Sequence, residues 1–248
     1  MWKATGPSGT VEIKAGTGEG AAITLREAHV LKAMGEPGRD VVMDRRQGLA
    51  WMVTPWFEGP STWDALRGVR EGRGDESAAL ACVIQLCEAV TQLHAAGWVH
   101  GDLQPQHSIH TKDGVRLIDC SWAWRRGFEP SYVFRGGLPH LLSPELAASV
   151  EAGTRPVAPM PADDVYALAA GVWWAVTGAW PLDYDAADIP VSSISAAQLR
   201  EVIATRRVPL CTTTVMPSLL QMMAAALLAP SERRPTAAQL GRAVGLGS

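Results

Sequence analysis

The chain has 248 residues, of which 47% are hydrophobic and 19% charged, so it can bury the core of one large domain or two joined lobes and is not typical of a disordered segment. Its formal net charge of −3 gives no electrostatic reason to expect nucleic acid or an anionic membrane as its main partner. Its four cysteines show no CxxC pairing, which argues against a zinc site and a disulfide framework and predicts a reducing, cytoplasmic location.

The first 60 residues predict strands and one helix. Residues 10–14 alternate polar and apolar, as a half-buried strand does, and the Gly-Pro-Ser-Gly sequence at residues 6–9 predicts a turn before them. Apolar side chains among charged ones over residues 23–34 predict a helix packed on one face, which the Gly-Glu-Pro-Gly sequence at residues 35–38 ends. Residues 49–54 form an apolar run of strand length.

The remainder of the chain has a mainly helical pattern. An apolar stripe over residues 80–94 predicts a helix that ends at Gly97, and two strand-like segments bracket a turn at residues 112–114. A segment rich in Arg, Gly and Pro follows over residues 120–142. Further helices are expected from there to Gly247.

These patterns divide the chain into two parts. We expect a small N-terminal lobe of strands with one helix carrying Glu27 over residues 1–58, and a larger helical lobe over residues 59–248. No internal repeat or low-complexity tract interrupts this division.

One apolar stretch raises the question of a membrane span. Residues 165–182 contain no charged side chain, and their number is close to the roughly 20 apolar residues that a span needs. Two glycines, a threonine and a terminal proline lie within the stretch, and Asp163 and Asp164 come directly before it. These features favour a buried helix of a soluble protein over a membrane span.

Several short segments together supply the groups that phosphoryl transfer from ATP requires. The protein's work in this reaction is to position the reactants and neutralise charge, with a lysine on the phosphates, carboxylates at the lysine and at the acceptor hydroxyl, and metal ligands. The candidate segments, in chain order, are Val11-Glu12-Ile13-Lys14, Arg26-Glu27-Ala28, His100-Gly101-Asp102-Leu103-Gln104-Pro105-Gln106-His107, Leu117-Ile118-Asp119, Ser143-Pro144-Glu145, Asp163-Asp164-Val165-Tyr166-Ala167-Leu168 and Arg233-Arg234-Pro235-Thr236.

These segments resemble, in order and spacing, the motifs of the protein kinase superfamily, in particular a bacterial Hanks-type Ser/Thr kinase: VAIK, the helix with its glutamate partner, HRDLKPxN, DFG, APE, SDVYSLG and RPS/T. One HxD alone would be weak, whereas several matches in the right order across most of the chain are specific. The resemblance implies an α+β, two-lobed protein-kinase-like fold, shortened at its N-terminus, whose small β-rich lobe lacks the first strand and the glycine-rich loop.

The resemblance also implies a role for each matching residue. Lys14 contacts the α- and β-phosphates of ATP, with Glu27 as its ion-pair partner. Asp102 accepts or orients the proton of the acceptor hydroxyl. Asp119 and His107 bind Mg²⁺, with Mn²⁺ as the alternative metal, because imidazole can ligate Mn²⁺.

Further matches concern the nucleotide base and the frame of the fold. The expected hinge beside the adenine ring, whose edge needs backbone hydrogen bonds, consists of Thr54, Pro55, Trp56 and Phe57. Glu145 and Arg234 are expected to form a buried ion pair in the large lobe. Asp164 is expected to hold the backbone of the catalytic loop.

The chain departs from the kinase pattern at several positions. It has no GxGxxG motif, so either the protein functions without that loop or the chain begins upstream of Met1. Gln104 replaces the lysine of the catalytic loop, His107 replaces its asparagine, and Gly101 replaces the arginine on which a phosphorylated activation loop docks. Leu138 replaces a threonine that helps to read a protein Ser/Thr substrate.

Three interpretations of function follow from this pattern. Retention of the lysine and its carboxylates favours an ATP-dependent phosphotransferase acting on a Ser/Thr hydroxyl of a peptide or protein, with a peptide-modifying biosynthetic pathway as one setting. The missing loop and the replaced residues favour a pseudokinase that acts as a binding or scaffold module. A small-molecule kinase is the third interpretation, because HGD also occurs in small-molecule phosphotransferases of related fold.

The expected partners follow from the first interpretation. They are a peptide or protein substrate, and a protein partner near the activation segment or over the open phosphate site, with no nucleic acid and no membrane. Trp122 and Trp124 lie beside Arg125 and Arg126 in the activation segment and offer a docking surface. Buried aromatic packing is the alternative interpretation of these tryptophans.

Overall fold

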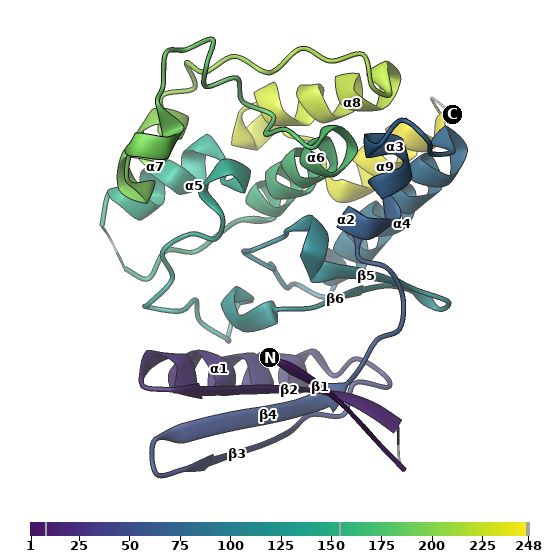
Figure 1. The fold of residues 1–248 in the computed structure, drawn as a ribbon. Helices are drawn as coiled ribbons and strands as arrows, with labels where there is room; N and C mark the ends of the chain where they lie inside the picture. The colour runs from purple at the N-terminus through teal and green to yellow at the C-terminus, as the bar shows by residue number, and fades with distance from the viewer. Residues whose placement is uncertain (8, 154, 247–248) are drawn as a thin grey trace.

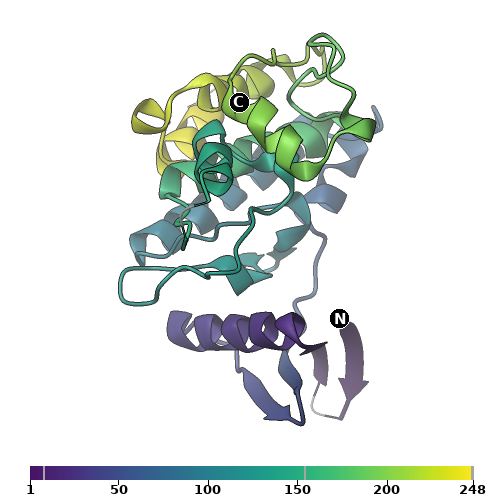
Figure 2. The ribbon, with the colours of Figure 1, turned by 90° about the vertical axis from the view of Figure 1, so that its left-hand side faces the viewer.

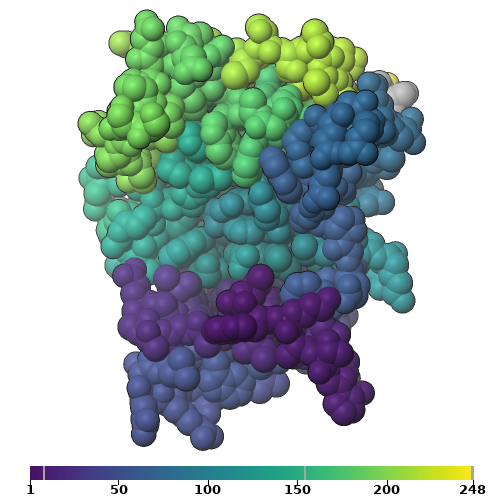
Figure 3. All heavy atoms as spheres, in the orientation of Figure 1, coloured from purple at the N-terminus to yellow at the C-terminus, as the bar shows by residue number. Residues whose placement is uncertain are grey.

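The computed structural model describes three stretches of the chain: residues 1–7, 9–153 and 155–246. Ser8 of the predicted turn and Gly247 at the predicted end of the helices lie outside the described residues. The described chain is α+β, with a small antiparallel sheet followed by helices (Figure 1). Figure 3 shows that the N-terminal residues gather at one end of the molecule and the C-terminal helices at the opposite end.

The N-terminal sheet has four antiparallel strands in the order β1-β2-β4-β3. The strands are β1 (Trp2–Gly6), β2 (Gly9–Thr17), β3 (Val42–Arg46) and β4 (Leu49–Pro55). In the pairing of β2 with β4, Lys14 lies opposite Met52 and Glu12 lies opposite Thr54. Because side chains alternate between the two faces of a strand, Glu12 and Lys14 point to the same face of the sheet.

One helix, α1 (Glu19–Met34), packs on this sheet (Figure 2). Its buried residues include Val30 and Leu31, in agreement with the predicted one-faced helix. The helix begins before the predicted start at residue 23, because the glycines around its first turn are weak helix formers and conceal the start in the sequence. It ends at Gly35, whose left-handed backbone (φ 64°) lets its N–H donate to the Leu31 carbonyl at 3.2 Å.

The described residues after β4 are mainly helical and contain one further pair of strands. The helices are α2 (Thr62–Ala65), α3 (Arg67–Arg70), α4 (Glu76–Ala95), α5 (Pro144–Glu151), α6 (Pro161–Thr177), α7 (Ala196–Ala204), α8 (Pro217–Leu228) and α9 (Ala237–Leu246). The predicted turn at residues 112–114 joins β5 (Ser108–Thr111) to β6 (Gly114–Leu117), which pair antiparallel.

Helix α6 is the buried helix that the apolar stretch predicts. Val165, Ala169 and Val172 are each at most 1% exposed, so the stretch packs inside the protein. The predicted extent to residue 182 is wrong, since the helix ends at Thr177. Gly178 adopts a left-handed conformation (φ 77°) and caps the helix, and the apolar residues beyond it belong to a loop.

Among the described residues, α4 is long and apolar enough to cross a membrane, by length and composition alone. In the structure α4 lies against α9 and β6, and Val83, Cys87 and Val90 on its inner face are buried. An apolar helix with one buried face is also what a core helix of a soluble protein looks like.

Candidate active site

Lys14 lies at the centre of a cluster of carboxylates drawn from three separate segments. Its Nζ donates to Glu27 Oε1 of α1 at 2.8 Å and to Asp119 Oδ1, which follows β6. A third carboxylate, Glu12 on the same strand, has its Oε1 at 3.6 Å from Nζ. The Lys14 side chain is only 13% exposed, so the fold holds the lysine largely buried between β2, α1 and the end of β6.

The environment of this cluster shifts the pKa of its members. Burial disfavours the Lys14 ammonium, but Glu27, Asp119 and Glu12 outweigh it and raise the pKa of Lys14 above its usual value. Burial raises the pKa of Glu27, with Lys14 acting in the opposite direction. For Asp119, burial is outweighed by the charge and hydrogen bond of Lys14, which lower its pKa. Lys14 is therefore positively charged and Asp119 ionised at neutral pH.

The loop between α4 and β5 carries Asp102, 13% exposed, beside this cluster. Asp102 Oδ1 accepts a hydrogen bond from Gln104 Nε2 at 2.9 Å. Gln104, which replaces the lysine of the kinase motif, therefore orients this carboxylate. Gly137 of the later segment lies against the same carboxylate, since a Cβ added at Gly137 would be 1.8 Å from Asp102 Oδ1. A residue larger than glycine at position 137 would therefore displace the Asp102 carboxylate.

Asp164 at the start of α6 binds the backbone of this loop, as predicted. Its two carboxylate oxygens accept hydrogen bonds from the backbone N–H groups of His100 (2.7 Å) and Gly101 (2.9 Å). Gly101 has a left-handed backbone (φ 80°), a conformation that an arginine adopts only with strain. Burial lowers the pKa of His100, so the ring is neutral, and its Nε2–H donates to the Ile118 carbonyl at 3.0 Å.

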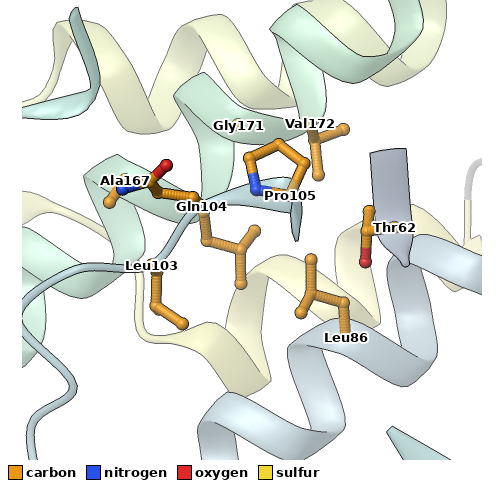
Figure 4. A pocket seen from close by; sticks show the side chains of 9 residues that line it. Thr62, Leu86, Leu103, Gln104, Pro105, Ala167, Gly171 and Val172 are labelled. Carbon is orange, nitrogen blue, oxygen red and sulfur yellow. The ribbon is translucent and has the colours of Figure 1, made fainter. Parts of the chain in front are cut away.

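A small apolar cavity lies on the other side of the same loop (Figure 4). Gln104 and Pro105 form one wall, and Gly171 and Val172 of α6 face them. A Cβ added at Gly171 would be 3.2 Å from Pro105 Cδ, so the helix and the loop approach closely at this glycine. Helix α6 thus positions the loop at two places, through Asp164 and through Gly171.

His107 joins Asp102 to Asp119. Its Nδ1–H donates to the Asp102 carbonyl at 2.9 Å. Its Nε2 lies 3.4 Å from Asp119 Oδ2. A carboxylate oxygen and an imidazole nitrogen placed together suit Mn²⁺ as well as Mg²⁺.

No group of three or more His, Cys, Asp or Glu that could hold a metal ion by itself occurs in the described ranges. A metal at Asp119 and His107 therefore needs further ligands from outside the protein, as Mg²⁺ commonly takes them from nucleotide phosphates and water. The donor set fits a metal that arrives with a nucleotide.

The predicted hinge is only partly available to a base. Thr54 is buried at the end of β4, and Pro55 has no N–H to donate. The Trp56 N–H already donates to the Thr10 carbonyl at 3.0 Å, so that amide belongs to the sheet and does not read a base edge. Carbonyl oxygens and the Phe57 amide remain as the candidate base-reading groups of this segment.

Arg26 is a residue of the site for which the sequence predicts no role. Its guanidinium donates to the backbone carbonyls of Ser121 (3.0 Å), Ala123 (2.9 Å) and Glu129 (2.9 Å). These carbonyls belong to the segment that follows Asp119, so Arg26 ties that segment to α1 next to Glu27. The sequence motif predicts a role for the neighbouring Glu27 alone. It cannot predict that of Arg26, because the acceptors of Arg26 are backbone carbonyls, which are the same for every residue type.

The two tryptophans of this segment pack within the protein. Trp122 contacts the buried Phe134 edge-on, with ring centroids 5.6 Å apart. The Trp124 indole N–H donates to the Pro159 carbonyl at 2.8 Å, and its backbone forms a two-way bridge with Val99. Both side chains are half-buried; aromatic packing accounts for Trp122 and a hydrogen bond holds Trp124, while the docking surface stays a prediction.

Replacing Arg26 with alanine is expected to increase amide hydrogen exchange over residues 119–129 by about tenfold or more, because three carbonyls lose a charged donor. Arg26→Lys should give an intermediate effect, since an ammonium cannot match the planar fork of the guanidinium. Lys32→Ala, which alters an exposed cation on the same helix, is the matched control. Equal exchange in Arg26→Ala and in this control would show that Arg26 does not brace the segment.

Comparison with known proteins supports a kinase-like relationship. No family model matches the sequence. The chain is similar to the serine/threonine-protein kinase pkn2 of Myxococcus xanthus, with 29% identity over 171 residues, which is 64% of this chain and 19% of that protein. It is also similar to the serine/threonine-protein kinases AfsK of Streptomyces coelicolor (28% identity, 54% of this chain, 16% of the relative) and Streptomyces griseus (27%, 56% and 16%). The match thus spans about a fifth or less of the length of these relatives, each of which is named as a Ser/Thr protein kinase.

Proposed function

We propose that this chain is an ATP-dependent phosphotransferase with the two-lobed protein-kinase-like fold, in which residues 1–58 form the small lobe and residues 59–248 the large one. The observation that supports the proposal is a convergence of three segments far apart in the chain. Lys14 lies within hydrogen-bond distance of both Glu27 and Asp119. An ordinary surface lysine on a strand has no such pair of carboxylate partners. The similarity to Ser/Thr protein kinases points the same way.

The proposed acceptor is a Ser or Thr hydroxyl of a peptide or protein. The hydroxyl oxygen forms a bond to the γ-phosphorus of ATP as the bond from that phosphorus to the bridging oxygen breaks, and ADP leaves. Asp102 accepts or orients the hydroxyl proton, and Gln104 keeps its carboxylate in place. Lys14 exchanges a carboxylate partner for the α- and β-phosphates.

The metal and base sites complete this proposal. Mg²⁺, or Mn²⁺, supplies positive charge that neutralises the phosphate oxygens when bound. Asp119 and His107 are the residues that would hold it, because a carboxylate oxygen and an imidazole nitrogen lie 3.4 Å apart there. The adenine ring lies beside the hinge of residues 54–57.

A pseudokinase is the second candidate, and one observation favours it. Three carboxylates surround the ammonium of Lys14, and the neutral Gln104 stands where a second cation would help to hold the phosphates.

A scaffold also needs a surface for its partner. Tyr132 in the activation segment is 68% exposed, and this apolar surface supports a protein partner near that segment. The cytoplasmic location remains part of the proposal.

The test of the proposed function is nucleotide binding followed by transfer. We expect weak ATP binding that requires a divalent cation and is at least as strong with Mn²⁺ as with Mg²⁺, measured by calorimetry on the full chain. Transfer of the labelled γ-phosphate to Ser or Thr should then be detected with candidate peptide or protein substrates. Divalent-dependent binding without transfer to any candidate supports the scaffold, and absence of nucleotide binding with both metals contradicts the phosphotransferase.

A further inference from the structure

Glu12 is a largely buried carboxylate at the candidate nucleotide site that the proposed reaction does not use. Its side chain is 12% exposed and lies on the same face of β2 as Lys14. Oε2 accepts a hydrogen bond from Thr54 Oγ1 at 3.4 Å, and Oε1 accepts none from any described residue. The carboxylate therefore lies between the start of the base-reading hinge and the phosphate-binding lysine.

The charges around this position do not balance. Glu12, Glu27 and Asp119 surround the single ammonium of Lys14. Glu27 and Asp119 each accept a hydrogen bond from the Lys14 ammonium, which accounts for their charge. Among the described residues, Glu12 has a cation only at the longer distance of 3.6 Å, again Lys14. A polyphosphate that approaches Lys14 meets this charge at short range.

We propose that Glu12 is the residue that sets nucleotide affinity at this site, by repelling ligands in proportion to the number of their phosphates. The inference rests on the proposed nucleotide cleft and goes beyond it, because it assigns a selectivity that the kinase resemblance does not contain. Without a divalent cation, the ammonium of Lys14 is engaged by the carboxylates and cannot offset the charge of the phosphates. A divalent cation that arrives with the nucleotide supplies the missing positive charge. The site thus discriminates between the cation-loaded nucleotide and the free nucleotide, and its base pocket accepts an uncharged nucleoside without this penalty.

The experiment compares wild type, Glu12→Gln and Glu12→Ala for binding of adenosine, ADP and ATP, with and without Mg²⁺, on the full chain. Glu12→Gln keeps the shape and the Thr54 contact and removes only the charge. At the effective dielectric of a protein surface, one unit charge a few ångströms from another changes an equilibrium by about tenfold or more. Affinity for ATP should therefore increase about tenfold, affinity for ADP by less, and affinity for adenosine should stay within about twofold.

Asp44→Asn is the matched control, because it removes one carboxylate charge from the exposed edge strand β3 of the same sheet. It should leave all affinities unchanged. Glu12→Ala separates charge from bulk: a gain for ATP alone supports the inference, whereas an equal gain for adenosine means that the side chain blocks the cleft sterically and contradicts it.

The failure of this inference differs from the failure of the proposed function. Measurable ATP binding that is unchanged in Glu12→Gln shows that Glu12 does not limit nucleotide binding and leaves the phosphotransferase untouched. Absence of measurable binding in both proteins contradicts this inference and the proposed function together. Tighter ATP binding in Glu12→Gln without phosphate transfer in any variant supports the role of Glu12 and contradicts the phosphotransferase.

Discussion

Asp119→Asn is expected to abolish the increase in nucleotide affinity that a divalent cation brings, whereas Asp102→Asn should leave nucleotide affinity within about twofold and reduce turnover by a factor of about 100 or more. The two carboxylates differ in what they face. Asp119 contacts Lys14 and lies 3.4 Å from His107 Nε2, which is the proposed phosphate and metal side of the site. Asp102 is held by Gln104 and lies against Gly137, which is the proposed acceptor side.

Asparagine is the appropriate replacement at position 119 because of the backbone there. Asp119 has a left-handed conformation (φ 56°, ψ 48°), which asparagine tolerates better than other side chains that carry a Cβ. The substitution therefore removes the charge without adding backbone strain. In the absence of divalent cations the same variant should not bind nucleotide more weakly than wild type, because only the metal-dependent part of the affinity is lost.

The measurement is calorimetric binding of ATP with Mg²⁺ or Mn²⁺, together with the rate of phosphate transfer. Asp113→Asn, which removes an exposed carboxylate in the turn between β5 and β6, is the control for a change in net charge. If Asp102→Asn loses nucleotide binding and Asp119→Asn retains it, the assignment of the two carboxylates to opposite sides of the cleft is wrong.

The parts of this molecule that the sequence predicts are those carried by side-chain type and spacing. The apolar stretch after Asp164 predicts a buried helix because burial on all sides demands apolar residues at every position. Its end at Thr177 is missed, since Gly178 lies within an apolar run that continues in the loop. The Asp164 contacts with the His100 and Gly101 amides follow from the motif alone.

The parts that sequence does not reveal depend on backbone groups and on neighbours distant in the chain. Arg26 bonds three carbonyls, and carbonyls are the same for every residue type. The commitment of the Trp56 amide to Thr10 depends on the sheet register, which no side chain of the hinge encodes. The position of Glu12, in contrast, can be predicted from sequence, because side chains two residues apart on a strand lie on the same face. The kinase motif, however, assigns a role to Lys14 and none to Glu12.

Arg234→Ala is expected to lower the free energy of unfolding by about 3–5 kcal/mol, the range for a buried ion pair that loses one partner. The Arg234 side chain is fully buried (0% exposed) and reaches Glu145 Oε2 at 3.0 Å. Its guanidinium also donates to the carbonyls of Ala226 (3.2 Å), Ala162 (3.0 Å) and Ala229 (3.0 Å). Truncation therefore leaves three carbonyls without this donor, removes one of the cations that Glu145 faces, and empties a fully buried position.

The structure corrects one part of the expected pair. Glu145 is 32% exposed and also contacts Arg206 and the Ser231 N–H, so only the arginine side of the pair is fully buried. The loss should therefore be asymmetric. Glu145→Gln leaves the buried Arg234 its carbonyl partners and an amide oxygen but no carboxylate, so it is expected to cost less than Arg234→Ala, about 1–3 kcal/mol.

Thermal and denaturant unfolding of Arg234→Ala, Glu145→Gln and the exposed neighbour control Arg233→Ala measure this asymmetry. For a chain of this length the melting temperature falls by about 2–4 °C for each kcal/mol, so Arg234→Ala should melt about 6–20 °C below wild type. Arg233→Ala should stay within about 0.5 kcal/mol. Because the pair lies away from Lys14 and Asp102, the result does not depend on whether the protein transfers phosphate. Equal melting temperatures for Arg234→Ala and Arg233→Ala would mean that the buried guanidinium does not stabilise the helices around it.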